Sequence, residues 1–151
     1  MNAIDLCSDL TARKSKLAVV GLGYVGLPLA VQFAKHYDVI GFYTNEKKVA
    51  RYKAGVDVTG EAGDAALKET DCKFTAQEEA LKDARFFVIA VPTPLNGDNT
   101  PDLTAVKEAT ALVARHLSRG SIVVYESTVY PGVTEDICRP ILERESGFAC
   151  G

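Results

Sequence analysis

The chain has 151 residues and a formal net charge of −3, with 47% of the residues hydrophobic and 25% charged. This length suits one domain with its own hydrophobic core, and the mixed charges give no electrostatic footprint for nucleic acid or an anionic membrane, so we expect neither as a partner. No apolar run is long enough for a membrane span, and the start lacks the apolar segment of a secretory signal, which favours a cytoplasmic location.

The first half of the chain predicts a polar lead-in, residues 1–15, and then two strand–helix units. A short β-branched run that begins at Lys16 ends in glycine, as strands buried on both faces often do. After it, apolar residues recur at the spacing of one helix face, with Pro28 in the first turn, where a missing N–H costs little. The predicted strands are 16–21 and 38–43, and the predicted helices are 24–37 and 45–55.

The second half continues this alternation after a turn-rich stretch at 56–65. Thr75 and Glu78 have the spacing of a capping box, which predicts a helix at 76–84. The run 85–91 is the most apolar of the chain and predicts a central strand, followed by a proline-rich loop. Asp102 then precedes a helix. The remaining predicted elements are strands at 72–75 and 121–128 and helices at 103–118 and 133–146.

The alternation of strands and helices predicts an α/β fold whose parallel sheet is covered on both faces. We therefore expect a Rossmann-like, doubly wound parallel sheet in a single domain of residues 16–151. Four scattered cysteines, without a C-x-x-C pair, predict neither a metal site nor a redox motif.

Gly21, Gly23 and Gly26 form a G-x-G-x-x-G motif between the first predicted strand and helix. In this setting the first glycine permits a tight turn, the second lets the backbone approach a pyrophosphate, and the third lets the helix pack close to the strand. The free N–H groups and the positive dipole end of the helix then face the phosphates. The motif predicts a dinucleotide site.

Tyr43 ends the second predicted strand, where an Asp or Glu would accept hydrogen bonds from the adenosine ribose. A tyrosine offers a phenol and a flat face but no carboxylate. Three interpretations remain open: a weakened ribose contact with Asn45 or a water taking over, a preference for the 2′-phosphate of NADP helped by Lys47 and Lys48, or an aromatic residue without a binding role. Loss of one charge-assisted hydrogen bond costs about 1.5–3 kcal/mol, which weakens NAD binding without abolishing it.

Two further strand ends carry unusual loops, and ligands of open α/β sheets lie outside the carboxyl ends of the strands. After the run 85–91, two prolines hold the backbone extended around Thr93, which could touch the ribose or a phosphate of the cofactor. Glu126, Ser127 and Thr128 follow the next strand. Either loop could also be a plain connection between a strand and a helix.

Three stretches, GLGYVGLPLA, VPTPLN…PDLT and YESTVYPGVTE, occur in this order. Together they resemble the N-terminal domain of the UDP-glucose/GDP-mannose dehydrogenases over residues 16–148. Within that family the chain is most similar to bacterial UDP-N-acetylhexosamine 6-dehydrogenases of the Vi polysaccharide type. The resemblance implies a full-length, homodimeric, NAD-dependent enzyme that oxidises the C6 alcohol of a UDP-sugar to a carboxylate for surface polysaccharide.

The resemblance also implies a site, residue by residue. Thr128 matches a threonine beside the nicotinamide that helps to hold the catalytic water, and we expect it to be catalytic. Lys48 matches a basic residue on the ribose side, whereas Tyr43 departs from the family's Asp. No metal is expected, NAD is the cofactor, and the expected contacts are Gly21, Gly23, Tyr24, Val25, Gly26, Tyr43, Asn45, Lys48, Val91, Pro92, Thr93, Ser127 and Thr128.

The family's thioester-forming cysteine and its other principal catalytic groups have no match in this sequence. We therefore expect Gly151 to be a cut within a longer protein that carries the catalytic and UDP-sugar-binding parts, and we expect the isolated chain to be inactive. Two alternatives remain. One is a β-hydroxyacid-type dehydrogenase, which the ESTVYPG stretch disfavours, and the other is a non-catalytic nucleotide-sensing or interaction module, which Tyr43 would suit.

Overall fold

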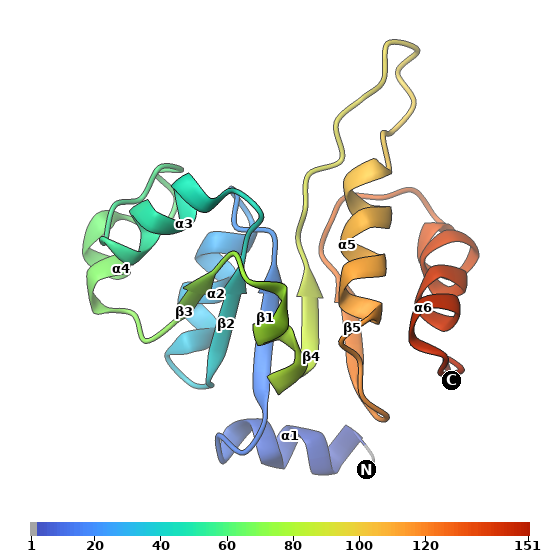
Figure 1. The fold of residues 1–151 in the computed structure, drawn as a ribbon. Coiled ribbons are helices and arrows are strands. Elements are labelled where there is room, and N and C mark those ends of the chain that lie inside the picture. Colours follow the sequence, from blue (N-terminus) through green and yellow to red (C-terminus); the bar gives the residue numbers. More distant parts are fainter. Residues whose placement is uncertain (1–2) are drawn as a thin grey trace.

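The computed structural model describes residues 3–151 and contains one five-stranded sheet, in which all neighbouring strands are parallel. The strand order is β3-β2-β1-β4-β5 (Figure 1). The strands are β1 (Lys16–Val20), β2 (Val39–Phe42), β3 (Lys73–Thr75), β4 (Ala84–Ile89) and β5 (Ile122–Tyr125). The chain adds strands outward from β1 to β3 and then returns to place β4 beside β1, as in a doubly wound fold. The predicted fold class is confirmed.

Alternate residues of the strands pack into two hydrophobic clusters, one on each face of the sheet. In β1, Leu17 and Val19 belong to a cluster with the helices on one face, whereas Ala18 and Val20 belong to a cluster on the other face, because successive side chains of a strand point to opposite sides. The first face is covered by α1 (Ala3–Thr11), α2 (Gly26–Ala34), α3 (Glu46–Lys53) and α4 (Asp64–Glu69). The second is covered by the 3₁₀-helix η1 (Glu78–Asp83) and α5 (Thr104–Ala114).

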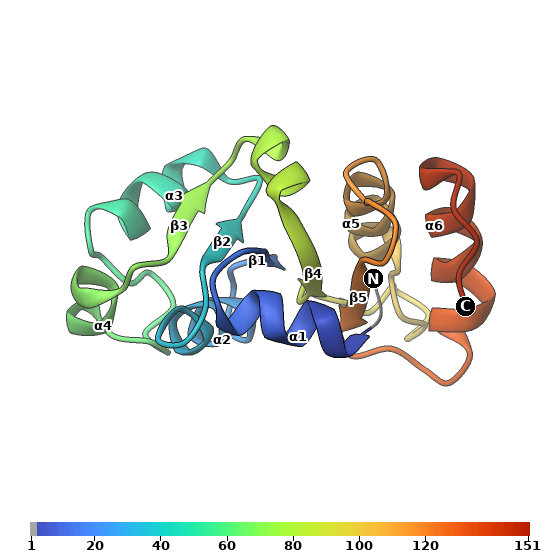
Figure 2. The ribbon, with the colours of Figure 1, turned by 90° about the horizontal axis from the view of Figure 1, so that it is seen from below.

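The segment that the sequence placed in a polar lead-in forms helix α1, which lies below the sheet in Figure 1 and in the foreground of Figure 2. Leu6 and Leu10 are four residues apart, so they share one face of this helix. Both are buried in the core cluster that also holds Leu17. These two leucines therefore hold α1 against the sheet.

The predicted capping box at Thr75 and Glu78 is wrong. The Thr75 hydroxyl accepts a hydrogen bond from the N–H of Gln77 (3.0 Å) instead, and the following turn is the 3₁₀-helix η1. Glu78 makes a tertiary contact instead: its carboxylate lies 3.1 Å from the guanidinium of Arg115, which follows the last residue of α5. Glu78 therefore forms an ion pair with another element on the same face of the sheet and does not take part in a capping box.

The predicted last helix is divided into two parts, the π-helical turn η2 (Val133–Cys138) and α6 (Arg139–Ser146). Pro140 stands in the first turn of α6 and has no N–H for the carbonyl four residues earlier, which widens the preceding turn. A third apolar cluster, with Val106 and Val133 in it, joins α5 to this segment. Helix α6 lies beside α5, on the side away from β4 (Figure 2).

The strands end earlier than the sequence predicts. The predicted strands 38–43, 85–91 and 121–128 end at Phe42, Ile89 and Tyr125, which leaves the residues after them in loops. The loop after β4 projects beyond the sheet at the end opposite α1 (Figure 1). Among the helices of residues 3–151, none has the length and apolar character that a bilayer crossing demands.

Candidate functional site

A cavity of about 380 Å³ lies where the loops after β1, β2, β4 and β5 meet. It follows the rule that ligands of open α/β sheets bind outside the carboxyl ends of the strands, where the strand order reverses. Of the predicted contact residues, all line this cavity except Gly21, Gly26 and Asn45. The residues that form its wall are Gly23, Tyr24, Val25, Tyr43, Lys48, Val58, Thr59, Ala90, Val91, Pro92, Thr93, Glu126, Ser127 and Thr128.

The three glycines of the motif have different reasons to lack a side chain. Gly21 has a φ of +100°, and a Cβ on it would come within 2.8 Å of the Ala90 carbonyl oxygen. A Cβ on Gly26 would overlap the carbonyl oxygen of Gly21. These two glycines are required by close packing between the loop, α2 and β4. Gly23 has open space on all sides, since nothing lies within 4 Å of an added Cβ, so packing does not require a glycine there.

Helix α2 begins at the edge of this cavity without a side-chain cap, although the N–H of Leu27 donates to the Gly23 carbonyl (3.1 Å). Val25 stands at its N-cap position and no side chain caps the helix. Uncapped amide N–H groups at a helix start, together with the positive end of the dipole, favour an anion such as a phosphate. Tyr24 and Val25 are 72% and 52% exposed at this point, so the approach to the amides is open.

A tyrosine of α3 holds the Gly-rich loop in place. The buried Tyr52 donates a hydrogen bond from its hydroxyl to the Leu22 carbonyl (2.8 Å). Burial raises the pKa of Tyr52 to about 12, with smaller contributions from Tyr43 and Asp57, so Tyr52 stays a neutral donor. Leu22 is itself fully buried. These contacts fix the loop before any ligand binds.

The end of β2 presents an aromatic and a cation to the cavity. The ring of Tyr43 stacks on Tyr52 at a centroid distance of 6.5 Å and an interplanar angle of 12°. The Lys48 ammonium lies 5.7 Å from the centroid of the Tyr43 ring. Asn45, a predicted contact, is outside the cavity wall and caps α3 by accepting a hydrogen bond from the N–H of Lys48 (3.1 Å).

The loops after β4 and β5 are joined by their own hydroxyl groups. The Thr93 hydroxyl donates to the Thr128 carbonyl (2.6 Å), and the Ser127 hydroxyl donates to the Val91 carbonyl (2.7 Å). Ser127 is buried, whereas Thr128 is exposed at the cavity wall. These two bonds make one rigid rim from two loops that are far apart in the sequence.

One part of the wall comes from the turn-rich segment, which the sequence analysis left without a role. Val58 and Thr59 line the cavity, and the Asp57 carboxylate organises their loop. Its oxygens accept hydrogen bonds from the N–H and hydroxyl of Thr59 (both 2.7 Å) and from the N–H groups of Ala62 and Gly63 (2.9 and 2.7 Å). An Asp–x–Thr turn is a recognisable signal for such a loop.

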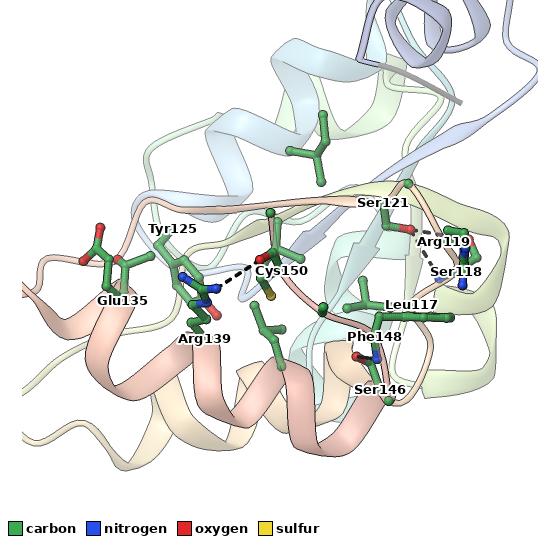
Figure 3. A pocket seen from close by; sticks show the side chains of 18 residues that line it. Leu117, Ser118, Arg119, Ser121, Tyr125, Glu135, Arg139, Ser146, Phe148 and Cys150 are labelled. Atoms are coloured by element: carbon green, nitrogen blue, oxygen red, sulfur yellow. Dashed lines mark hydrogen bonds between the residues drawn. The ribbon is translucent and has the colours of Figure 1, made fainter.

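Two other hollows bear on this assignment. Gly21 lines one of about 530 Å³ on the α5 side, which shares Tyr43, Val91 and Pro92 with the first cavity. A larger one, of about 710 Å³, lies between β5, α6 and the last residues (Figure 3). There the Arg139 guanidinium donates to the Cys150 carbonyl (3.1 Å). The wall of this larger hollow contains none of the predicted contact residues, and we assign it no cofactor.

The residues at the strand ends fit a dinucleotide. An open glycine position and an uncapped helix start suit a pyrophosphate, and the cavity extends from Lys48 on one side to Thr128 on the other. NAD, when bound, supplies the hydride acceptor, while Gly23 and Tyr43 would lie against its diphosphate and adenosine ribose. Fold and site together define a Rossmann dinucleotide-binding domain.

The chain belongs to the UDP-glucose/GDP-mannose dehydrogenase family, whose NAD binding domain model matches residues 15–150. It is 52% identical over 134 residues to the UDP-N-acetyl-D-glucosamine 6-dehydrogenase of Salmonella typhi, which covers 88% of this chain and 32% of that protein. It is 49% identical over 135 residues to Protein CapL of Staphylococcus aureus, which covers 89% of this chain and 32% of that protein.

A solved structure shows the same architecture. The UDP-D-ManNAc dehydrogenase from Pyrococcus horikoshii superposes with a TM-score of 0.83 at 37% identity, over 90% of this chain and 34% of that one. The chain thus spans about a third of the length of the relatives that it matches. The family and the cofactor that the sequence predicted are confirmed.

Proposed function

We propose that this chain is the NAD-binding domain of a UDP-N-acetylhexosamine 6-dehydrogenase, which oxidises the C6 alcohol of its sugar to a uronic acid for surface polysaccharide. The observation that carries the proposal is the open position of Gly23 beside the uncapped start of α2. Packing does not require a glycine there, so its value lies in the room it leaves for a diphosphate. The relative from Salmonella typhi, 52% identical over 134 residues, supports the substrate class.

Within this proposal Thr128 is the catalytic contact of the domain. It is exposed on the cavity wall and its carbonyl accepts a hydrogen bond from Thr93. The role proposed for its hydroxyl is to hold a water near the nicotinamide. Oxidation of an alcohol through a covalent thioester also requires a thiol at the substrate carbon. Within residues 3–151, no cysteine lines the cavity; Cys138 is fully buried and Cys150 lines a different hollow. The isolated chain therefore binds cofactor without turnover.

The proposal also covers the setting of the full-length enzyme. We place it in the cytoplasm as a homodimer whose partners are NAD and a UDP-sugar, not nucleic acid or membrane. Four free thiols agree with a reducing compartment, and the net charge of −3 disfavours polyanionic partners.

The test is calorimetric titration of the chain with NAD, for the unchanged protein and for Gly23→Val. Because a Cβ at position 23 has no protein atom within 4 Å, the variant should fold normally and lose at least tenfold in NAD affinity. Gly97→Val is the matched control, since position 97 is equally open and lies outside the cavity wall. We expect this control to bind NAD like the unchanged chain.

Two results would contradict the proposal. The first is equal NAD affinity in Gly23→Val and the unchanged chain. The second is the absence of any NAD binding at millimolar concentration by folded protein. A parallel assay with UDP-N-acetylglucosamine should give no NADH from the isolated chain, and clear turnover would show that the catalytic groups lie within it.

A further inference from the structure

We propose that the ribose end of this site accepts a phosphate on the adenosine 2′ oxygen, so that the domain binds NADP as well as NAD. The inference rests on the proposed function, because it assigns the adenosine ribose to the part of the cavity lined by Tyr43 and Lys48. It chooses among the three interpretations of Tyr43 that the sequence leaves open.

The chemistry of the residue at the end of β2 decides which ribose is accepted. A carboxylate there accepts hydrogen bonds from the free ribose hydroxyls and repels a 2′-phosphate, whereas a cation nearby accommodates the phosphate. A phenol donates one hydrogen bond and carries no charge at neutral pH, and an ammonium only donates. Tyr43 and Lys48 therefore offer donors and remove the repulsion.

Both groups are available to a ligand. Among residues 3–151, neither the Tyr43 hydroxyl nor the Lys48 ammonium has a hydrogen-bond or ion-pair partner, and the ammonium lies over the Tyr43 ring at 5.7 Å from its centroid. A cation over an aromatic face is held only weakly at an exposed site, so a dianionic phosphate can replace that contact.

The aromatic platform is built into the fold. Tyr43 packs against the core and stacks on Tyr52, which is fixed by its hydrogen bond to the Leu22 carbonyl. The aromatic ring thus fills the place of the usual acid with a side chain that its neighbours hold in position. Tyr43 and Lys48 both line the cavity, so the ring and the ammonium of the β2 end belong to the same wall.

The charged groups around this end do not replace the missing acid. The Asp57 carboxylate is turned to its own loop by four hydrogen bonds from three residues. On the α5 side, Arg115 and Glu108 line the adjoining hollow, and Arg115 is paired with Glu78. Lys48 remains as the charged side chain of the cavity wall on the β2 side, and Glu126 stands after β5, on the other side of the wall.

The experiment measures the dissociation constants of NAD and NADP by calorimetry for the unchanged chain, Tyr43→Asp and Lys48→Met, with AMP and adenosine 2′,5′-bisphosphate as fragment probes. Lys53→Met is the matched control, because Lys53 is exposed on the same helix and does not line the cavity. The unchanged chain should bind NADP within about threefold of NAD, and the bisphosphate more tightly than AMP.

The variants should separate the two cofactors. Loss of a charge-assisted contact corresponds to about tenfold or more. Lys48→Met should therefore weaken NADP about tenfold and NAD much less, while Tyr43→Asp should weaken NADP and tighten NAD by about tenfold each. Lys53→Met should change neither.

NAD binding with NADP rejected by tenfold or more would overturn this inference and leave the proposed function intact. Equal effects of Lys48→Met on both cofactors would also overturn it. Failure of the chain to bind either dinucleotide would overturn the proposed function, and this inference with it.

Discussion

Gly26 opens α2 at a point where the helix meets the turn of its own loop. An added methyl group there would overlap the Gly21 carbonyl oxygen, whereas at Gly23 it would meet nothing. Forced overpacking typically costs about 1–3 kcal/mol, and unobstructed surface changes stay within about 0.5 kcal/mol. We predict that Gly26→Ala lowers the free energy of unfolding by about 2 kcal/mol or more, measured by denaturant titration without ligand. Gly23→Ala is its control, and equal losses in the two variants would show that the loop relaxes at position 26.

Tyr52 couples the stability of the loop to the site. Its hydroxyl is buried and bonded to the Leu22 carbonyl at 2.8 Å. Tyr52→Phe leaves that carbonyl without its partner, which we predict costs about 1–2 kcal/mol of unfolding free energy. NAD affinity should fall two- to fivefold as the loop loosens. Tyr37→Phe, at a partly buried position remote from the cavity wall, should change neither quantity; a loss of stability without loss of affinity would separate Tyr52 from the site.

At the scale of elements, the loop between α3 and α4 depends on the ionised Asp57. Burial alone would raise the pKa of this carboxyl, but hydrogen bonds from Thr59, Gly63 and Ala62 outweigh it and lower the pKa from 3.8 to about 2. A group whose pKa is lower in the folded state adds stability above its unfolded pKa and loses it as pH falls through the folded one. We predict a loss of about 1–2 kcal/mol between pH 4 and pH 2, after allowance for solvent screening.

Asp57→Asn tests that assignment, because the variant lacks the charge and one of the two acceptor oxygens. It should be less stable at pH 7, and its stability should change less than that of the unchanged chain between pH 4 and pH 2. Asp98→Asn is a suitable control, since Asp98 makes the same pair of bonds to Thr100 in a fully exposed loop. Identical acid profiles of Asp57→Asn and the unchanged chain would refute the role of Asp57.

Elements that depend on local pattern could be predicted from the sequence, and those that depend on tertiary contacts could not. The apolar run 85–91 predicted a central strand, and β4 does lie between β1 and β5. Asp102 was expected before a helix, and it accepts the hydrogen bond from the N–H of Thr104 near the start of α5 (2.9 Å). The predicted capping box of Thr75 and Glu78 was wrong, because the Glu78 carboxylate pairs with Arg115, which is distant in the sequence. The last helix was divided at Pro140, whose effect the periodicity alone did not reveal.

The same division holds for the site as a whole. The glycine motif and the strand-end loops predicted most of the cavity wall, since parallel strands bring their carboxyl ends to one edge. Val58 and Thr59 were missed because only the folded loop of Asp57 brings them to the cavity. Asn45 was expected at the ribose, and in the structure its side chain caps α3. Its contact with the cofactor stays a prediction.

At the scale of the whole molecule, NAD binding should stabilise the fold. Hydrogen exchange can show whether the ligand occupies the 380 Å³ cavity at the strand ends or the 710 Å³ hollow beside α6. At a free NAD concentration one hundred times the dissociation constant, the unfolding free energy should rise by about 2.7 kcal/mol. Hydrogen exchange should then slow at the Gly-rich loop, the loop after β4 and the rim at Ser127, because their amides line the 380 Å³ cavity. Exchange by local opening in α6 and the segment that follows it, around the larger hollow of Figure 3, should stay unchanged. Protection concentrated around Arg139 and Cys150 instead would move the cofactor to that hollow and refute the site at the strand ends.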